Sequence, residues 1–204
     1  MKFFLRKFNK SNRGFTFVET LVALSIFTLS VLAMISVLSR GIADTGYVKR
    51  KMIASYLAQE GVEYIRNLRD TYVLFNVGSP QEGWNTFQSR LTSDAGANCD
   101  DLSKGCYFDD QPVSYSDDSQ PILDMTIAPC NDSRCSSAVI YYQPLKSEYS
   151  YDSSGAGTVD SGFRRSIKIT VVNANEMKVE ATVFWTESSG NQQTISSGTL
   201  FNWI

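Results

Sequence analysis

The chain has 204 residues, enough for one globular domain with an appendage, and its apolar fraction of 43% favours a folded body over a disordered one. It contains no histidine, so the commonest general base and the commonest metal ligand are both missing. The first fourteen positions hold five basic residues and no acid; without these five, 14 basic residues face 21 acids, so the remainder carries a charge of −7. A basic leader before an acidic body suits an exported protein, and a body of this charge is expected to repel nucleic acid.

An apolar segment follows the leader, from Phe15 to Leu38, with Glu19 as its single charged residue. At a rise of about 1.5 Å per residue a helix of this length spans about 36 Å, more than the roughly 30 Å core of a bilayer. The segment is longer than the apolar stretch of a cleaved secretory signal, and no small-x-small cleavage site follows it. We therefore predict a membrane anchor with its N-terminus in the cytoplasm and the chain beyond residue 40 outside.

The residues at the start of the anchor form a recognisable motif. The basic leader ends in RG, at positions 13 and 14, and is followed by FTFVE and the apolar run. This order closely resembles the signature of type IV prepilins, a family of pilins, minor pilins and the pseudopilins of type II secretion. The resemblance implies cleavage between Gly14 and Phe15 by a membrane aspartyl peptidase, followed by N-methylation of the new Phe15 amine.

The resemblance also gives Glu19 a role. A carboxylate at bilayer depth is costly, so membrane helices rarely carry one without a reason. In filaments of this family the equivalent glutamate neutralises the Phe15 amine of a neighbouring subunit, which rewards correct register between subunits. The alternative is a plain signal anchor in which Glu19 is an incidental interfacial acid.

A helical pattern continues beyond Arg40. Apolar residues recur at three- and four-residue steps, namely Ile53, Tyr56, Leu57, Tyr64, Ile65 and Leu68. This predicts one helix from about Phe15 to Arg69, weakened at Gly41 and Gly46, where a hinge and a loop or kink are the open alternatives. Residues 58–70 and 19–24 resemble minor pilins more than a major subunit.

The remaining chain predicts a small helix and a sheet. Ser79 to Glu82 reads as a capping box with proline at the first helical position, and Trp84, Phe87 and Leu91 follow at helical spacing as core residues. Period-two alternation predicts strands over 165–171, 177–185 and 194–203, the last interrupted at 197–198, with a hairpin turn at 188–191. The expected fold class is α+β: a long N-terminal helix packed on a C-terminal antiparallel sheet, with disulfide-bearing loops, as in pilins.

Four cysteines, Cys99, Cys106, Cys130 and Cys135, lie in the polar loops expected outside the cell, where disulfides persist. Three pairings are possible, and we favour pairing within each sequence-local couple because short loops close first. A zinc site using all four is the alternative, although six-residue spacing is loose for zinc.

Other candidate sites are weaker. Three acidic pairs, Asp100–Asp101, Asp109–Asp110 and Asp117–Asp118, and the loop from Asp152 to Asp160 could attract calcium, but no spacing matches an EF-hand, so solvated loop charge is favoured. The basic cluster of Arg164, Arg165 and Lys168 is interpreted as a solvated face rather than a DNA site. Without histidine, a nucleophilic serine or cysteine lacks its usual base, so we predict no enzymatic activity, no metal and no cofactor.

These inferences divide the chain into a leader (1–14), a transmembrane half of the stem helix (15–38), an amphipathic outer half (39–70) and an extracytoplasmic globular domain (71–204). The predicted function is a minor-pilin-like subunit that is anchored in the cytoplasmic membrane and polymerises through its helix into a cell-surface or periplasmic filament. Its expected partners are other pilin subunits, the prepilin peptidase, the pilus or secretion assembly machinery and membrane lipid, with no nucleic acid. The alternatives are a type II secretion pseudopilin and an anchored adhesin or binding module that never polymerises.

Overall fold

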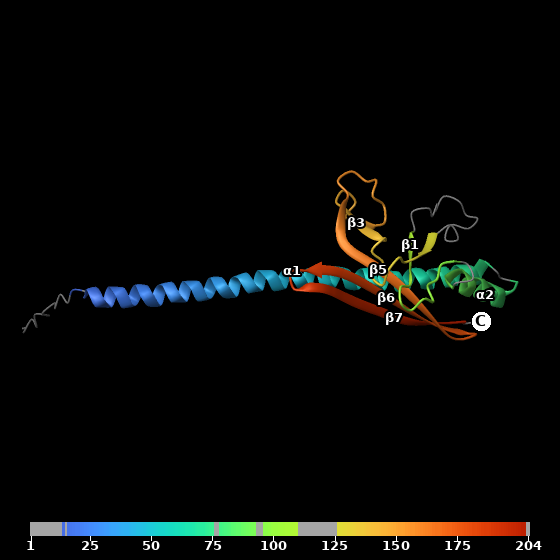
Figure 1. Cartoon of the computed structure of the whole chain (residues 1–204), viewed down its shortest axis with the longest axis horizontal. Helices are drawn as coiled ribbons and strands as arrows, with labels where there is room; N and C mark the ends of the chain where they lie inside the picture. The colour runs from blue at the N-terminus through green and yellow to red at the C-terminus, as the bar shows by residue number, and fades with distance from the viewer. Residues whose placement is uncertain (1–13, 15, 76–77, 93–95, 110–125, 203–204) are drawn as a thin grey trace, which may run out of the picture. The chain divides into compact units, whose positions relative to one another are not determined.

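One long helix, α1 (Phe17–Phe75), begins the part of the chain that the structure describes. The structure is a computed structural model, and it describes residue 14 and residues 16–75, 78–92, 96–109 and 126–202 (Figure 1). The leader residues 1–13 and Phe15 therefore lie outside the described residues. The chain separates into two compact units, an N-terminal unit (Met1–Tyr47) and a C-terminal unit (Val48–Ile204).

The helix α1 is continuous, as predicted, but it ends later than predicted. Gly41 and Gly46 are both helical, so the chain forms no loop there. The helix ends at Phe75 rather than near Arg69, because Tyr72 and Val73 are buried in the core of the C-terminal unit and extend the packed face by another turn.

A second helix, α2 (Pro80–Leu91), packs with Trp84, Phe87 and Leu91 fully buried, as the spacing predicted. Proline stands at its start, but the predicted capping box is wrong: the Ser79 side chain makes no capping bond. The carbonyl of Ser79 instead accepts the backbone N–H of Glu82, at 2.9 Å.

The seven strands that the structure describes form one antiparallel sheet. They are β1 (Cys106–Asp109), β2 (Thr126–Pro129), β3 (Val139–Gln143), β4 (Glu148–Ser150), β5 (Val159–Asn173), β6 (Glu176–Glu187) and β7 (Gly190–Phe201). The central strand β5 pairs with β6 on one edge and with β3 and β1 on the other, while β7 pairs with β6. Apart from β6 and β7, the strands follow the order β2-β1-β5-β3-β4 across the sheet.

Two strands run further than predicted. Strand β5 begins at Val159 instead of Arg165 because β3 pairs with its first residues and completes their backbone hydrogen bonds. Strand β7 continues through Ser197 and Gly198, where an interruption was expected. A Cβ at Gly198 would lie 3.3 Å from Val62 Cγ1 of α1, so this glycine permits a close approach of helix and strand rather than a break.

The core lies between the outer part of α1, α2 and one face of the sheet (Figure 1). Its α1 members are Val62, Ile65, Leu68, Tyr72 and Val73, and its sheet members are Phe108, Ile167, Ile169, Met177, Val179, Ala181 and Leu200. Gly61 sets the distance between helix and sheet, since a Cβ there would lie 2.9 Å from Ile167 Cδ1 and 3.1 Å from Ala181 Cβ. The predicted architecture, a long helix covered by an antiparallel sheet, is confirmed.

Candidate assembly site

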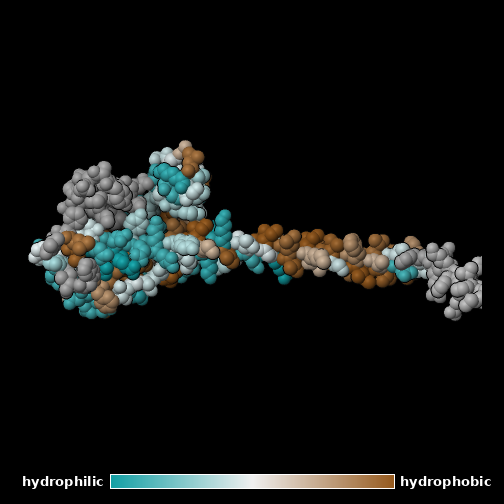
Figure 2. Space-filling view, turned by 180° about the vertical axis from the view of Figure 1, so that it is seen from behind, coloured by the Kyte–Doolittle hydropathy of each residue, from teal (hydrophilic) through white to brown (hydrophobic). Residues whose placement is uncertain are grey.

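The part of α1 from Phe17 to Leu38, within the N-terminal unit, is largely apolar and exposed. Phe17, Val18 and Leu21 are 77%, 67% and 49% exposed, and the exposed apolar residues continue through Leu38. Figure 2 shows these side chains as an apolar surface on this part of the helix. Within the described residues, one helix, starting at Phe17, is long and apolar enough to cross a membrane. An exposed apolar surface of this extent is typical of a site that contacts a membrane or another protein.

Four hydroxyl groups of this apolar part, those of Thr20, Ser25, Thr28 and Ser30, donate to carbonyls of the same helix. Thr20 Oγ1 donates to Phe17 O and Ser25 Oγ to Leu21 O, each at 2.8 Å, and Thr28 and Ser30 make equivalent bonds. Each hydroxyl therefore has an acceptor without water. The polar residues consequently do not prevent the helix from entering an apolar environment.

The N-terminus of α1 is capped by Thr16. Its Oγ1 accepts the backbone N–H of Glu19 at 3.3 Å, and its carbonyl accepts the N–H of Thr20 at 3.2 Å. Thr16 and Glu19 thus occupy the first and fourth positions of a capping box. Thr16 was not predicted as a cap, although the pattern Thr-x-x-Glu before an apolar run indicates one.

Glu19 and Gly14, the described residue of the predicted cleavage site, are both exposed at this end of the chain. The acidic side chain is exposed in the first turn of α1, where the helix dipole favours negative charge. Gly14 is exposed, with open space where a Cβ would stand. Phe15, whose amine the cleavage would free, lies outside the described residues.

The C-terminal part of α1 is attached to the sheet by a buried arginine that the sequence analysis interpreted wrongly. Arg165, at 3% exposure, donates from Nη1 to Leu57 O and to Glu60 Oε2, both at 2.8 Å. Its guanidinium carbon lies 4.6 Å from the centre of the Phe108 ring, a cation–π contact. Arg165 is therefore not part of a solvated basic face, and its neighbour Arg164 pairs with Asp160 instead.

Two disulfides fix the loops beside β1 and β3. Cys99 pairs with Cys106 and Cys130 with Cys135, which is the local pairing expected from the sequence. The first bridge belongs to the main core, and Cys99 O accepts the N–H of Ile169 at 2.8 Å, which ties its loop to β5. Each of the four sulfurs is bonded to its disulfide partner, so none of them presents a thiolate to zinc.

Several acidic loop residues considered for calcium close turns of their own. Asp101 Oδ1 accepts the Ser103 hydroxyl at 2.6 Å and its N–H at 2.8 Å, and these bonds hold the pKa of Asp101 below its ordinary value. Asp152 makes the same pair of bonds with Ser154. No group of three or more metal-binding side chains exists among the described residues; positions 110, 117 and 118 lie outside them.

Comparisons with known proteins point to the N-terminal motif. Residues 9–35 match the family model of the prokaryotic N-terminal methylation motif. The type II secretion system protein I of Vibrio cholerae serotype O1 is 31% identical over 83 residues, which cover 41% of this chain and 70% of that protein. No solved structure matches the chain.

Proposed function

Because the chain belongs to the type IV pilin and pseudopilin family, whose members are structural and not enzymes, we propose that it is a minor-pilin-like subunit of a type IV pilus-type filament. The observation that carries this proposal is the division of α1. Its first part is exposed and apolar with four of its hydroxyls bonded internally, whereas one face of its last part is buried by the sheet. One half is thus available for a membrane or for neighbouring helices, while the other half carries a folded body.

The processing steps follow from the motif. We propose that the peptidase removes residues 1–14 between Gly14 and Phe15, that the Phe15 amine is methylated, and that residues 15–38 span the cytoplasmic membrane. The N-terminus would face the cytoplasm, with residues 39–70 and 71–204 outside. Two disulfides in the C-terminal unit support an oxidising compartment for that unit.

Glu19 then directs polymerisation. In a filament core its carboxylate would pair with the freed amine of Phe15 from a neighbouring subunit. Removing one partner of a buried ion pair leaves the other uncompensated, at about 3–5 kcal/mol. Subunits in the wrong register would meet that cost, so the pair selects one axial arrangement.

The test replaces Glu19 by glutamine in the native host and measures sheared filaments by immunoblot. We expect normal membrane levels, normal cleavage and methylation of Phe15 by mass spectrometry, and loss of the subunit from filaments. Glu63→Gln is the matched control, because Glu63 is an exposed acid on the same helix that pairs only with Arg66 in the structure's described part. Normal incorporation of the Glu19→Gln subunit would refute the pairing of Glu19 with the Phe15 amine. Absence of the unaltered subunit from filaments would favour a tethered binding module that never polymerises.

A second candidate is a type II secretion pseudopilin, which the similarity to the Vibrio cholerae protein favours. Both candidates require the same anchor, cleavage and Glu19 pairing. Deletion of the gene separates them: a pilus subunit predicts loss of surface filaments with secretion intact. A pseudopilin predicts retention of exported proteins inside the envelope.

A further inference from the structure

A hollow of about 410 Å³ lies on the face of the sheet that points away from α1. Side chains alternate along β6, and Val183 and Trp185 are buried on the α1 side, so Phe184 between them points to the opposite face. Phe184 and Arg164, which are paired across β6 and β5, line the hollow together with the loop containing Arg134. The volume lies within the range of about 300–1,000 Å³ that is usual for small-molecule sites.

The loop that forms one wall is fixed in place. The Cys130–Cys135 disulfide closes it, and Asp132 Oδ1 accepts the backbone N–H groups of Arg134 at 2.9 Å and of Ser136 at 3.2 Å. These bonds hold the Asp132 carboxylate against its own turn. They also occupy the backbone donors that a phosphate would otherwise find in such a loop.

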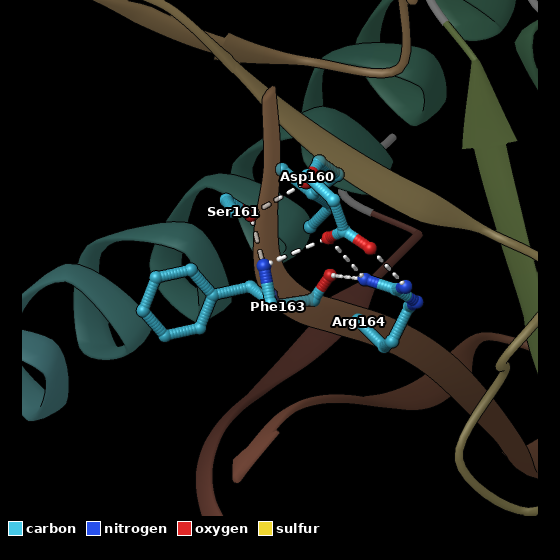
Figure 3. A network of polar contacts seen from close by, with 6 residues as sticks. Asp160, Ser161, Phe163 and Arg164 are labelled. Atoms are coloured by element: carbon cyan, nitrogen blue, oxygen red, sulfur yellow. Dashed lines mark hydrogen bonds and ion pairs between the residues drawn. The ribbon is translucent and has the colours of Figure 1, made fainter. Parts of the chain in front are cut away.

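The other wall is fixed by the network drawn in Figure 3. Arg164 donates to both carboxylate oxygens of Asp160, at 3.0 and 2.8 Å, and to the carbonyl of Phe163 at 2.8 Å. Asp160 also accepts the N–H of Gly162 at 2.8 Å. The three bonds use three of the five N–H groups of the Arg164 guanidinium.

Arg134 brings a positive charge to the hollow, which the Asp132 carboxylate also lines. Its guanidinium carbon lies 5.7 Å from the centre of the Phe184 ring, and no carboxylate in the described part of the chain forms an ion pair with it. A planar guanidinium binds a carboxylate through two parallel hydrogen bonds. This cation lies on a body whose overall charge is negative, so it attracts an anion locally rather than over the whole surface.

The remaining lining adds hydroxyl groups and an apolar floor. Ser133, Ser136 and Thr186 line the hollow together with Arg134, and the half-buried Phe184 ring lies below the guanidinium. The Ser136 hydroxyl already donates to the Asp132 carboxylate and the Thr186 hydroxyl to Asn191 Oδ1, so the Ser133 hydroxyl and Thr186 Oγ1 as an acceptor remain for a ligand. Hydroxyls match a polyhydroxylated ligand, and an aromatic ring suits the C–H groups of a sugar. We propose that this hollow binds an acidic saccharide, a uronic-acid-type sugar whose carboxylate pairs with Arg134. The site is independent of the α1 surface used for assembly.

The test uses the full chain in micelles of a polyoxyethylene detergent, which carries neither sugar nor charge. Binding of D-glucuronate is measured by saturation-transfer NMR titration at low ionic strength, where screening is weak. We expect a Kd on the order of 1 mM, usual for a ligand of this size. D-glucose, which lacks the carboxylate, and N-acetylglycine, which lacks the hydroxyls, should each bind at least tenfold more weakly.

Arg134→Gln should weaken glucuronate binding at least tenfold, whereas Arg66→Gln, the same change at an exposed arginine of α1, should leave it unchanged. The urea midpoint of each variant shows whether the fold is intact. Equal binding of glucuronate by the Arg134→Gln protein overturns the proposal. So does absence of binding to the unaltered chain, or binding of N-acetylglycine or inorganic phosphate as tight as that of glucuronate, since the site would then accept any anion or a peptide carboxylate.

Discussion

Replacing Glu60 by alanine tests whether the buried Arg165 attaches the sheet to α1 through charge. The side chain of Arg165 is 4% exposed and that of Glu60 is 42% exposed, with Nη1 and Oε2 2.8 Å apart. Two charges about 4 Å apart interact by about 4 kcal/mol at an effective dielectric constant of 20. Solvent around Glu60 reduces this value, whereas the uncompensated charge left on Arg165 adds to it, so we expect a loss of about 3 kcal/mol in the free energy of unfolding.

The double variant Glu60→Ala with Arg165→Met separates charge from packing. Methionine fills much of the same space without a charge to desolvate, so the double variant should be more stable than Glu60→Ala alone and lie within about 1.5 kcal/mol of the unaltered protein. Glu63→Ala is the control, because an exposed pair of this kind contributes less than about 1 kcal/mol.

The assay is urea unfolding of the full chain in polyoxyethylene micelles, followed by tryptophan fluorescence. Trp84 and Trp185 are both buried in the C-terminal unit, so the signal reports the core that the ion pair joins. A loss of 3 kcal/mol should also lower the thermal midpoint by about 6–12 °C in a unit of this size. A double variant as unstable as Glu60→Ala would refute the reasoning, because the cost would then lie in packing and not in a stranded charge.

Three further predictions concern the same unit. Gly61→Val should lower the free energy of unfolding by about 2 kcal/mol in the same urea assay, because the added methyl groups overlap β5 and β6; an unchanged midpoint would show that helix and sheet can separate at little cost. The double substitution Cys99→Ser and Cys106→Ser should lower the free energy of unfolding by about 2.5 kcal/mol relative to the unreduced chain, because it opens the loop that the disulfide closes. A urea midpoint of the unaltered chain that does not change with reducing agent would contradict this. The hydrogen bonds from Arg164 hold the pKa of Asp160 below its ordinary value. The carboxylate of Asp160 therefore contributes fully to the free energy of unfolding above the unfolded pKa of about 3.9, and this contribution is lost as the pH falls through the folded pKa. Asp160→Asn should remove less than about 1 kcal/mol at pH 7 and flatten the acid limb of stability against pH, and an unaltered acid limb would exclude that role.

The sheet was predictable where burial follows a local pattern. In β6, Met177, Val179 and Val183 alternate with polar residues, and each alternating apolar position is buried. Strand β5 was predicted short because residues 159–164 carry turn-forming serine and glycine. Their extended conformation depends on pairing with β3, which lies elsewhere in the sequence.

The burial of Arg165 was not predicted, because its ion-pair partner could not be identified from the sequence. The alternation that buries Ile167 and Ile169 also places Arg165 on the inner face, so a signal for its burial was present in the sequence. Its partner Glu60 is 105 positions away, and nothing in the sequence joins the two. Arginine is rarely buried without a partner, so the sequence alone favoured a surface position for Arg165.

The capping pattern makes a related point. Ser/Thr-x-x-Glu occurs at both helix starts, yet the side-chain bond forms at Thr16 and not at Ser79. The pattern offers an oxygen to the fourth residue, but the conformation of the first residue decides whether that oxygen reaches the N–H. Ser79 has φ −152° and ψ 72°, outside the extended conformation usual for a capping residue. Four letters of sequence do not specify these angles.

The apolar side chains of α1 are covered in different ways in its two halves. We therefore expect variants of the first half to affect assembly and variants of the second half to affect stability. In the first half the apolar side chains have no cover within the chain, and each side chain of this size gains about 1.5–3 kcal/mol on burial. In the second half the sheet already provides that cover, held by Arg165 and Glu60. Glu19→Gln should therefore change assembly with the urea midpoint unaltered, whereas Glu60→Ala should lower the midpoint with cleavage after Gly14 unaltered. If Glu60→Ala also abolished cleavage, the two halves would be coupled, and the body would have to be folded on α1 before the peptidase could act.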